Sequence, residues 1–117
     1  MKVFDIASAV IEAKQEELAT THTLNNQNLV IFQGYCRVID DFIADGWGNK
    51  ISVDVVTEKN LMKVDIQVMD FTYQPVIRST NYMDILERAI GVKFTPVDGE
   101  FILIEFLFPS LFDPVNQ

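Results

Sequence analysis

Two segments near the N-terminus carry apolar residues at helical spacing. Over residues 3–19 they recur every three or four positions, which predicts an amphipathic helix. The segment 29–44 is ambiguous, because it opens with four consecutive apolar residues that are also typical of a strand. Its later spacing favours a helix with Asn28 as N-cap and Gly46 just beyond its end. A polar loop over 20–28 is expected between the two helices.

The second predicted helix has one apolar face and one unusual residue. Its apolar face is formed by Ile31, Tyr35, Val38 or Ile39, and Phe42. Gly34 lies inside this helix, where glycine costs roughly 1 kcal/mol relative to alanine. We therefore expect a close packing contact at Gly34 that explains its presence.

Farther along the chain, the period changes from helical to that of a strand. Apolar and polar residues alternate over 51–55 and again over 64–68, which predicts an antiparallel hairpin with one polar face, toward the edge of a sheet. Pro75 should end the second strand, because it lacks a backbone donor. A short third helix is expected from Ser79 or Thr80, with Gly91 as its terminator.

The C-terminal part contains the strongest hairpin signature and the most apolar strand. Strands over 92–97 and 100–108 flank the tight turn Asp98-Gly99, and Pro96 requires an edge or outward position. Alternation divides the last strand into one face with Ile102, Ile104, Phe106 and Phe108, and another with Phe101, Leu103, Glu105 and Leu107. Both faces are largely apolar, so we expect cover on both sides, by helices or by a partner.

These elements predict one α+β domain over residues 1–108, followed by an irregular tail over 109–117. The chain of 117 residues is long enough for one ordinary core. The expected order is helix, helix, strand, strand, helix, strand, strand, with two hairpins forming an antiparallel four-stranded sheet packed against helices. No Gly-rich loop joins a strand to a helix, which disfavours a doubly wound nucleotide-binding fold.

The charge balance narrows the range of partners. Nine Lys and Arg against 17 Asp and Glu give a formal charge of −8. Such a chain repels phosphates, which disfavours direct binding of nucleic acid or of an anionic membrane surface. Either the acidity serves solubility alone, or the partner is a protein with a basic surface.

Cysteine content and hydropathy bear on location. No stretch approaches the roughly 20 apolar residues that cross a membrane. The first residues lack the apolar core and cleavage site of a secretory signal. Cys36 is the only cysteine, which agrees with a reducing compartment, so we expect a cytoplasmic protein.

Candidate chemistry is sparse. His22 is the only histidine and Cys36 the only cysteine, so no spacing motif for a metal exists. Cys36 in an apolar helix is typical of a buried thiol rather than a nucleophile, and no serine or cysteine nucleophile accompanies His22. We therefore predict no catalytic, cofactor-binding or metal-binding residue, and a protein that is not an enzyme.

The remaining candidates are protein-binding residues of two kinds. An acidic end of the second helix has the wrong sign for the helix dipole, although a solvated helix end is the alternative. Trp47 between two glycines is either an interface anchor or a lid on the core. The predicted binding residues are Asp40, Asp41, Asp45, Trp47, Phe101, Leu103, Leu107, Leu111 and Phe112.

Three function classes compete on this basis. The first is a non-catalytic acidic protein-binding module, such as a small inhibitor, an immunity-type protein or a dedicated chaperone that occupies a basic protein surface. The second is a structural or assembly subunit of a phage or other homo-oligomer. Because a second copy of the chain is the simplest cover for the outer face of the last strand, we expect a homodimer. The third is a small enzyme with an unrecognised Asp/Glu site.

Overall fold

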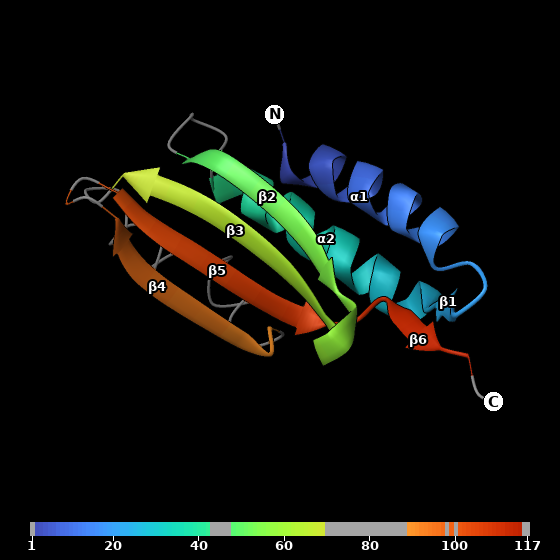
Figure 1. Ribbon diagram of the computed structural model, residues 1–117. Coiled ribbons are helices and arrows are strands. Elements are labelled where there is room, and N and C mark those ends of the chain that lie inside the picture. Colours follow the sequence, from blue (N-terminus) through green and yellow to red (C-terminus); the bar gives the residue numbers. More distant parts are fainter. Residues whose placement is uncertain (1, 43–47, 70–88, 98, 100, 116–117) are drawn as a thin grey trace.

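The computed structural model describes residues 2–42, 48–69, 89–97, 99 and 101–115 (Figure 1). Its elements are α1 (Val3–Glu17), β1 (His22–Leu24), α2 (Asn26–Phe42), β2 (Gly48–Val56), the 3-10 helix η1 (Thr57–Lys59), β3 (Leu61–Met69), β4 (Gly91–Val97), β5 (Phe101–Pro109) and β6 (Phe112–Pro114). Two N-terminal helices followed by antiparallel strands confirm the α+β class. Pro75 and the main part of the third predicted helix, 79–88, lie outside the described residues.

The four longer strands form one antiparallel sheet in the order β2-β3-β5-β4. Both predicted hairpins are present, because β2 pairs with β3 and β4 pairs with β5. The turn of the second hairpin contains Gly99 at φ +83°, a conformation that residues with a side chain rarely adopt. Pro96 is exposed on β4, an outer strand of the sheet order, as its missing donor requires. The first hairpin was predicted to lie toward the edge of the sheet. Its strand β2 is at the edge, while β3 lies between β2 and β5 in the interior.

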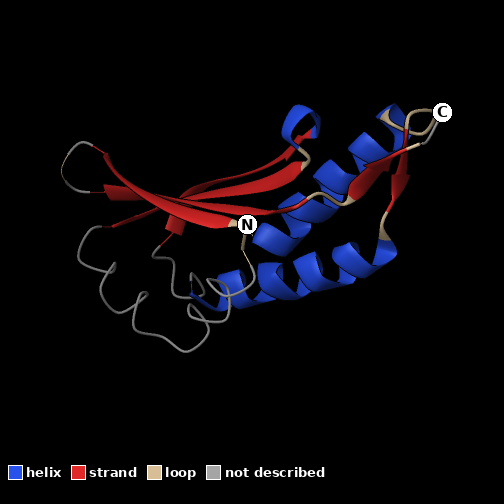
Figure 2. Cartoon of the chain, turned by 90° about the horizontal axis from the view of Figure 1, so that it is seen from below, coloured by secondary structure: helices blue, strands red, loops and turns tan. Residues whose placement is uncertain are grey.

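Both helices lie on the same side of the sheet, and the core fills the space between them (Figure 2). The buried core is made of Val3, Ala7, Ile11, Phe32, Cys36, Ile39, Val53, Met62, Val64, Ile66, Ile104, Phe106, Phe108, Leu111 and Phe112. The prediction for the last strand is confirmed at Ile104 and Phe106, which are 2% and 1% exposed. Ile102 is only partly buried, at the margin of the core.

The first helix follows its predicted pattern. Val3, Ala7 and Ile11 are its buried residues, and their spacing of four places them on one face. This face contacts both β2 and α2. The helix ends at Glu17, two residues before the predicted limit.

The second helix differs from the prediction at its start and in its buried face. It begins at Asn26, because the Asn25 side chain caps it by accepting the backbone N–H of Asn28 at 3.0 Å. Phe32 replaces Ile31 as the first residue of the buried stripe, and Ile31 is 40% exposed. The apolar face is thus centred about one residue later than predicted, on Phe32, Cys36 and Ile39, while Tyr35 and Val38 pack at its margin.

Gly34 does not make the predicted packing contact. It is exposed, and a Cβ atom added there would meet no described atom within 4 Å beyond its chain neighbours and the backbone of its own helix. The expectation of a close approach at Gly34 within the described chain is therefore wrong. The helix carries the cost of a glycine without a contact that requires it.

The C-terminal segment contains a short strand where an irregular tail was predicted. Residues 112–114 form β6, which pairs antiparallel with β1 inside the segment predicted as a loop. The backbone N–H of Asn25 donates to the carbonyl of Leu111 at 2.7 Å, next to this small sheet. We call residues 110–115 together with β1 the C-terminal clasp. Its strands were missed because each is only three residues long, too short to show a period.

A pair of alanine substitutions on β5 tests the division of its two faces. Phe106→Ala should lower the free energy of unfolding by about 3 to 5 kcal/mol, since it removes a fully buried ring. Leu107→Ala, at the adjacent position on the opposite face, should cost less. Chemical denaturation of both variants measures the difference, and equal losses would contradict the assignment of faces.

Candidate functional site

The outer face of the sheet carries the predicted apolar residues of the last strand. Phe101, Leu103 and Leu107 alternate along β5 with the buried residues of the core side, so they lie on the opposite face, and none of them belongs to the core cluster. Each is partly exposed. α1 and α2 both lie on the other side of the sheet (Figure 2). The structure therefore groups these three predicted residues on one surface.

Charged residues cross the middle of the same face. Asp65 of β3 lies directly opposite Glu105 of β5, and Glu105 lies opposite Lys93 of β4. Lys63 forms an ion pair with Asp65, with 3.5 Å between Nζ and Oδ2. The other oxygen of Asp65, Oδ1, is buried and has no hydrogen-bond partner among the described residues. Burial raises the pKa of Asp65, Lys63 opposes this shift, and Glu105 adds to it.

Asp40 has an internal partner rather than a free carboxylate. Its Oδ1 accepts the backbone N–H of Val3 at 2.6 Å, and its Oδ2 accepts that of Phe4 at 3.0 Å. Lys2, the N-cap residue of α1, provides no side-chain hydrogen bond. Asp40 therefore caps α1 from the second helix, and its charge matches the positive end of the helix dipole.

The other predicted residues at this end of α2 are in different situations. Asp41 is exposed to solvent beside the Asp40 cap. The Arg37 guanidinium lies 4.6 Å from the centre of the Phe4 ring, a cation–π contact that adds to the junction of the helices. Asp45 and Trp47 lie outside the described residues.

Leu111 and Phe112 lie inside the protein. They are 0% and 2% exposed and belong to the core cluster. In this conformation neither side chain is available to a partner. The clasp fixes the backbone around these two residues. The Ser110 hydroxyl donates to the carbonyl of Phe112 and accepts the backbone N–H of Phe112, both at 3.1 Å.

Cys36 and His22, the residues with nucleophilic or basic potential, lie in different environments. Cys36 is fully buried, and burial raises the pKa of its thiol to about 12, with Asp40 adding to the shift and Arg37 opposing it. Such a thiol stays protonated near neutral pH. His22 is partly exposed in β1, with its Nδ1 at 2.8 Å from the Thr21 hydroxyl. Within the described ranges, no three His, Cys, Asp or Glu side chains gather to hold a metal ion.

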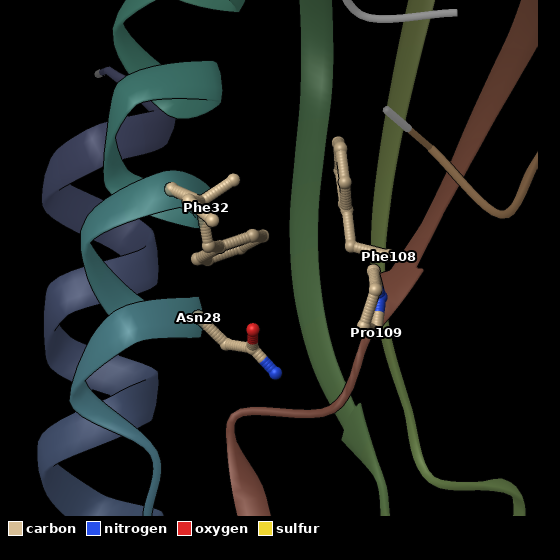
Figure 3. A pocket seen from close by; sticks show the side chains of 5 residues that line it. Asn28, Phe32, Phe108 and Pro109 are labelled. Carbon is tan, nitrogen blue, oxygen red and sulfur yellow. The ribbon is translucent and has the colours of Figure 1, made fainter. Parts of the chain in front are cut away.

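A pocket between α2 and β5 was not predicted from the sequence. Its volume is about 140 Å³, and it is lined by Asn28, Ile31, Phe32, Phe108 and Pro109 (Figure 3). Val30, 67% exposed, precedes Ile31 of the pocket rim on α2. Two adjacent exposed β-branched residues extend the apolar surface beyond the pocket itself.

A signal for these exposed residues was present in the sequence. The run Leu29-Val30-Ile31-Phe32 lies in a segment assigned to a helix. Four consecutive residues of a helix point around its whole circumference, so some of them must face away from the core. The pocket wall from β5 had no such signal, because Phe108 and Pro109 reach α2 only through the tertiary fold.

Comparisons of the chain with protein-family models, with curated proteins and with solved structures find no match. In the part of the chain that the structure describes, no helix combines the length and the apolar character needed to cross a bilayer.

Substitution at Asp40 tests the cap between the helices. Asp40→Ala should lower the free energy of unfolding by about 1 to 2 kcal/mol, because it leaves two backbone donors of α1 without their acceptor. Asp40→Asn keeps one acceptor oxygen and should lose less. Asp41→Ala is the matched control on the exposed neighbour and should leave stability nearly unchanged. A loss at Asp41 equal to that at Asp40 would contradict the capping role.

The pH dependence of stability tests the environment of Asp65. Its pKa in the folded protein lies above the ordinary value of 3.8, so the folded state binds this proton more tightly than the unfolded state. Below 3.8 the carboxyl is protonated in both states, and its unfavourable effect on folding is absent. As pH rises through the raised pKa, the wild type should lose stability relative to Asp65→Asn. Denaturation of both proteins across this range measures the effect, with Glu12→Gln on the exposed face of α1 as the control, because Glu12 is not among the charges that shift the pKa of Asp65; parallel curves for all three would refute it.

Proposed function

We propose that this protein is a non-catalytic protein-binding module that acts on a protein with a basic surface. A small inhibitor, an immunity-type protein or a dedicated chaperone fits this description, in the cytoplasm. The observation that carries the proposal is the exposed apolar surface of α2 at Val30 and Ile31, beside an apolar pocket. Adjacent exposed apolar residues at the mouth of a pocket are typical of interaction sites.

The charge of the chain supports the choice of partner. A formal charge of −8 attracts a basic protein over long distances and accelerates the encounter, while it repels nucleic acid. Asp41, one of the predicted acidic residues, is exposed to solvent at the C-terminal end of the same helix. Asp40 contributes to this surface less than the sequence indicated, because its oxygens are engaged by α1.

Affinity capture with quantitative mass spectrometry tests the proposal. Tagged wild type is compared with the double variant Val30→Glu/Ile31→Glu and with Val115→Glu, an exposed control in the clasp. A specific partner should be basic, be retained by the control, be lost by the double variant, and bind more slowly as salt rises. No protein enriched by the wild type over the double variant would overturn the proposal.

A second candidate function is that of an assembly subunit. It is favoured by Phe101, Leu103 and Leu107, which share the outer face of the sheet without cover from α1 or α2. A two-fold dimer through this face would bury them. Sedimentation at micromolar concentration distinguishes the candidates, because a monomer unaffected by Leu103→Glu excludes a dimer through the outer face.

The third class, an enzyme with an Asp/Glu site, has Asp65 and Glu105 as its best candidates, and assays for hydrolysis would test it.

A further inference from the structure

The pocket between α2 and β5 has a well-defined chemical character. Its walls are the rings of Phe32 and Phe108, the side chain of Ile31 and the ring of Pro109. The two phenylalanine rings meet edge to face at 5.4 Å between centroids, so this wall is fixed by packing. Tyr35 stacks on Phe108 from the next turn of α2, with 5.8 Å between ring centroids. The pocket is therefore held open by side chains that have little freedom to collapse into it.

One polar group is aimed at this apolar space. The Asn28 amide nitrogen donates to the carbonyl of Ser110 at 3.0 Å, which fixes the orientation of the side chain. In Figure 3 the Asn28 oxygen is consequently turned toward Phe32 and Phe108, and the nitrogen toward the segment after Pro109. No hydrogen bond from the described residues reaches this oxygen. An oriented acceptor at the mouth of an apolar pocket selects a ligand with both an apolar group and an N–H donor.

The size of the pocket limits the apolar group. A volume of about 140 Å³ is close to the cavity of about 150 Å³ that accepts a benzene ring. One large side chain, such as that of phenylalanine or leucine, fills such a space. The apolar surface continues outside the pocket over Val30, so the ligand extends beyond the group that enters. An anionic lipid or metabolite is disfavoured by the charge of −8 and by a polar group that is a neutral amide.

We propose that the α2–β5 pocket binds one bulky apolar side chain of a partner protein segment, whose backbone N–H donates to the Asn28 oxygen. The inference rests on the proposed protein-binding function and names the site and the anchor. The anchor ring packs between Phe32, Phe108 and Pro109, while the adjacent chain of the partner passes over Val30 and Ile31. Anchors of this kind in well-packed pockets carry most of the binding energy of an interface.

The test titrates the isotopically labelled full chain with N-acetylphenylalanine methylamide and follows its amide and methyl NMR resonances. Saturable shifts at millimolar probe should centre on Ile31, Phe32 and Phe108. Ile31→Glu should weaken binding by at least about tenfold, because it places a charge at the apolar rim. Val115→Glu is the matched control, since Val115 and Ile31 are both 40% exposed and only Ile31 lines the pocket. Ile31→Ala provides a test without a charge if the glutamate variant fails to fold.

A second probe separates a peptide ligand from a free apolar molecule. Toluene carries the ring without the amide, so it should bind several times more weakly than the amino-acid probe. Equal binding of the two would overturn the role of Asn28 and indicate a site for small apolar molecules. Absence of saturable shifts with either probe would overturn the pocket assignment.

These outcomes are distinguishable from failure of the proposed function. A partner captured by the wild type and by Ile31→Glu equally, with no probe binding, refutes the pocket and leaves the protein-binding function standing. Probe binding without any captured partner refutes the function and not the pocket. Shifts of the same resonances on raising the concentration of the protein alone would show that a second copy is the occupant, and would overturn the assignment to a different protein.

Discussion

The packing of Phe108 is the interaction on which the other parts of this fold depend. Its ring meets Phe32 of α2 edge to face at 5.4 Å and lies parallel to Phe106 of the same strand at 6.4 Å between centroids. Phe108 is also the last buried residue of β5 before the chain leaves the sheet for the clasp. Sheet, helix and C-terminal segment thus meet at one side chain. Aromatic contacts of this geometry add stability beyond the area they bury.

The clasp and the Asp40 cap hold the outer parts of the molecule to this centre. The clasp fixes Asn25 and Asn28 at the start of α2, because Leu111 and Ser110 accept hydrogen bonds from them. At the other end of α2, Asp40 holds the start of α1. Both ends of one helix are therefore tied to segments distant in the sequence. This leaves its exposed face, with Val30 and Ile31, on a rigid support.

Local patterns predicted the regular elements well and the tertiary roles poorly. The period of two in β5 and the Asp-Gly turn are properties of neighbouring residues, so the strand, its hairpin and the burial of Ile104 and Phe106 followed directly. Asp40 was assigned to a binding surface because no local pattern reveals its role as a cap. The backbone N–H groups that donate to its carboxylate lie 36 and 37 positions away in the sequence. Leu111 and Phe112 were assigned to the binding surface for the same reason. The strand that pairs with Phe112, β1, is too short to be recognised from the sequence. Only the helix side of the pocket could be predicted. The apolar run over residues 29–32 is too wide for one face of a helix, so part of it must be exposed.

The pairing of β1 with β6 also has a consequence for the order of folding. It joins residues 22–24 to residues 112–114, so the loop that it closes contains every described element from α2 to β5. Closing such a loop early costs much more chain entropy than closing a hairpin, and proteins rich in distant contacts fold slowly. The β2–β3 and β4–β5 hairpins can form from neighbouring residues, while the clasp has to wait for them. During synthesis on the ribosome, the start of α2 therefore stays without its partners until the final strand has emerged.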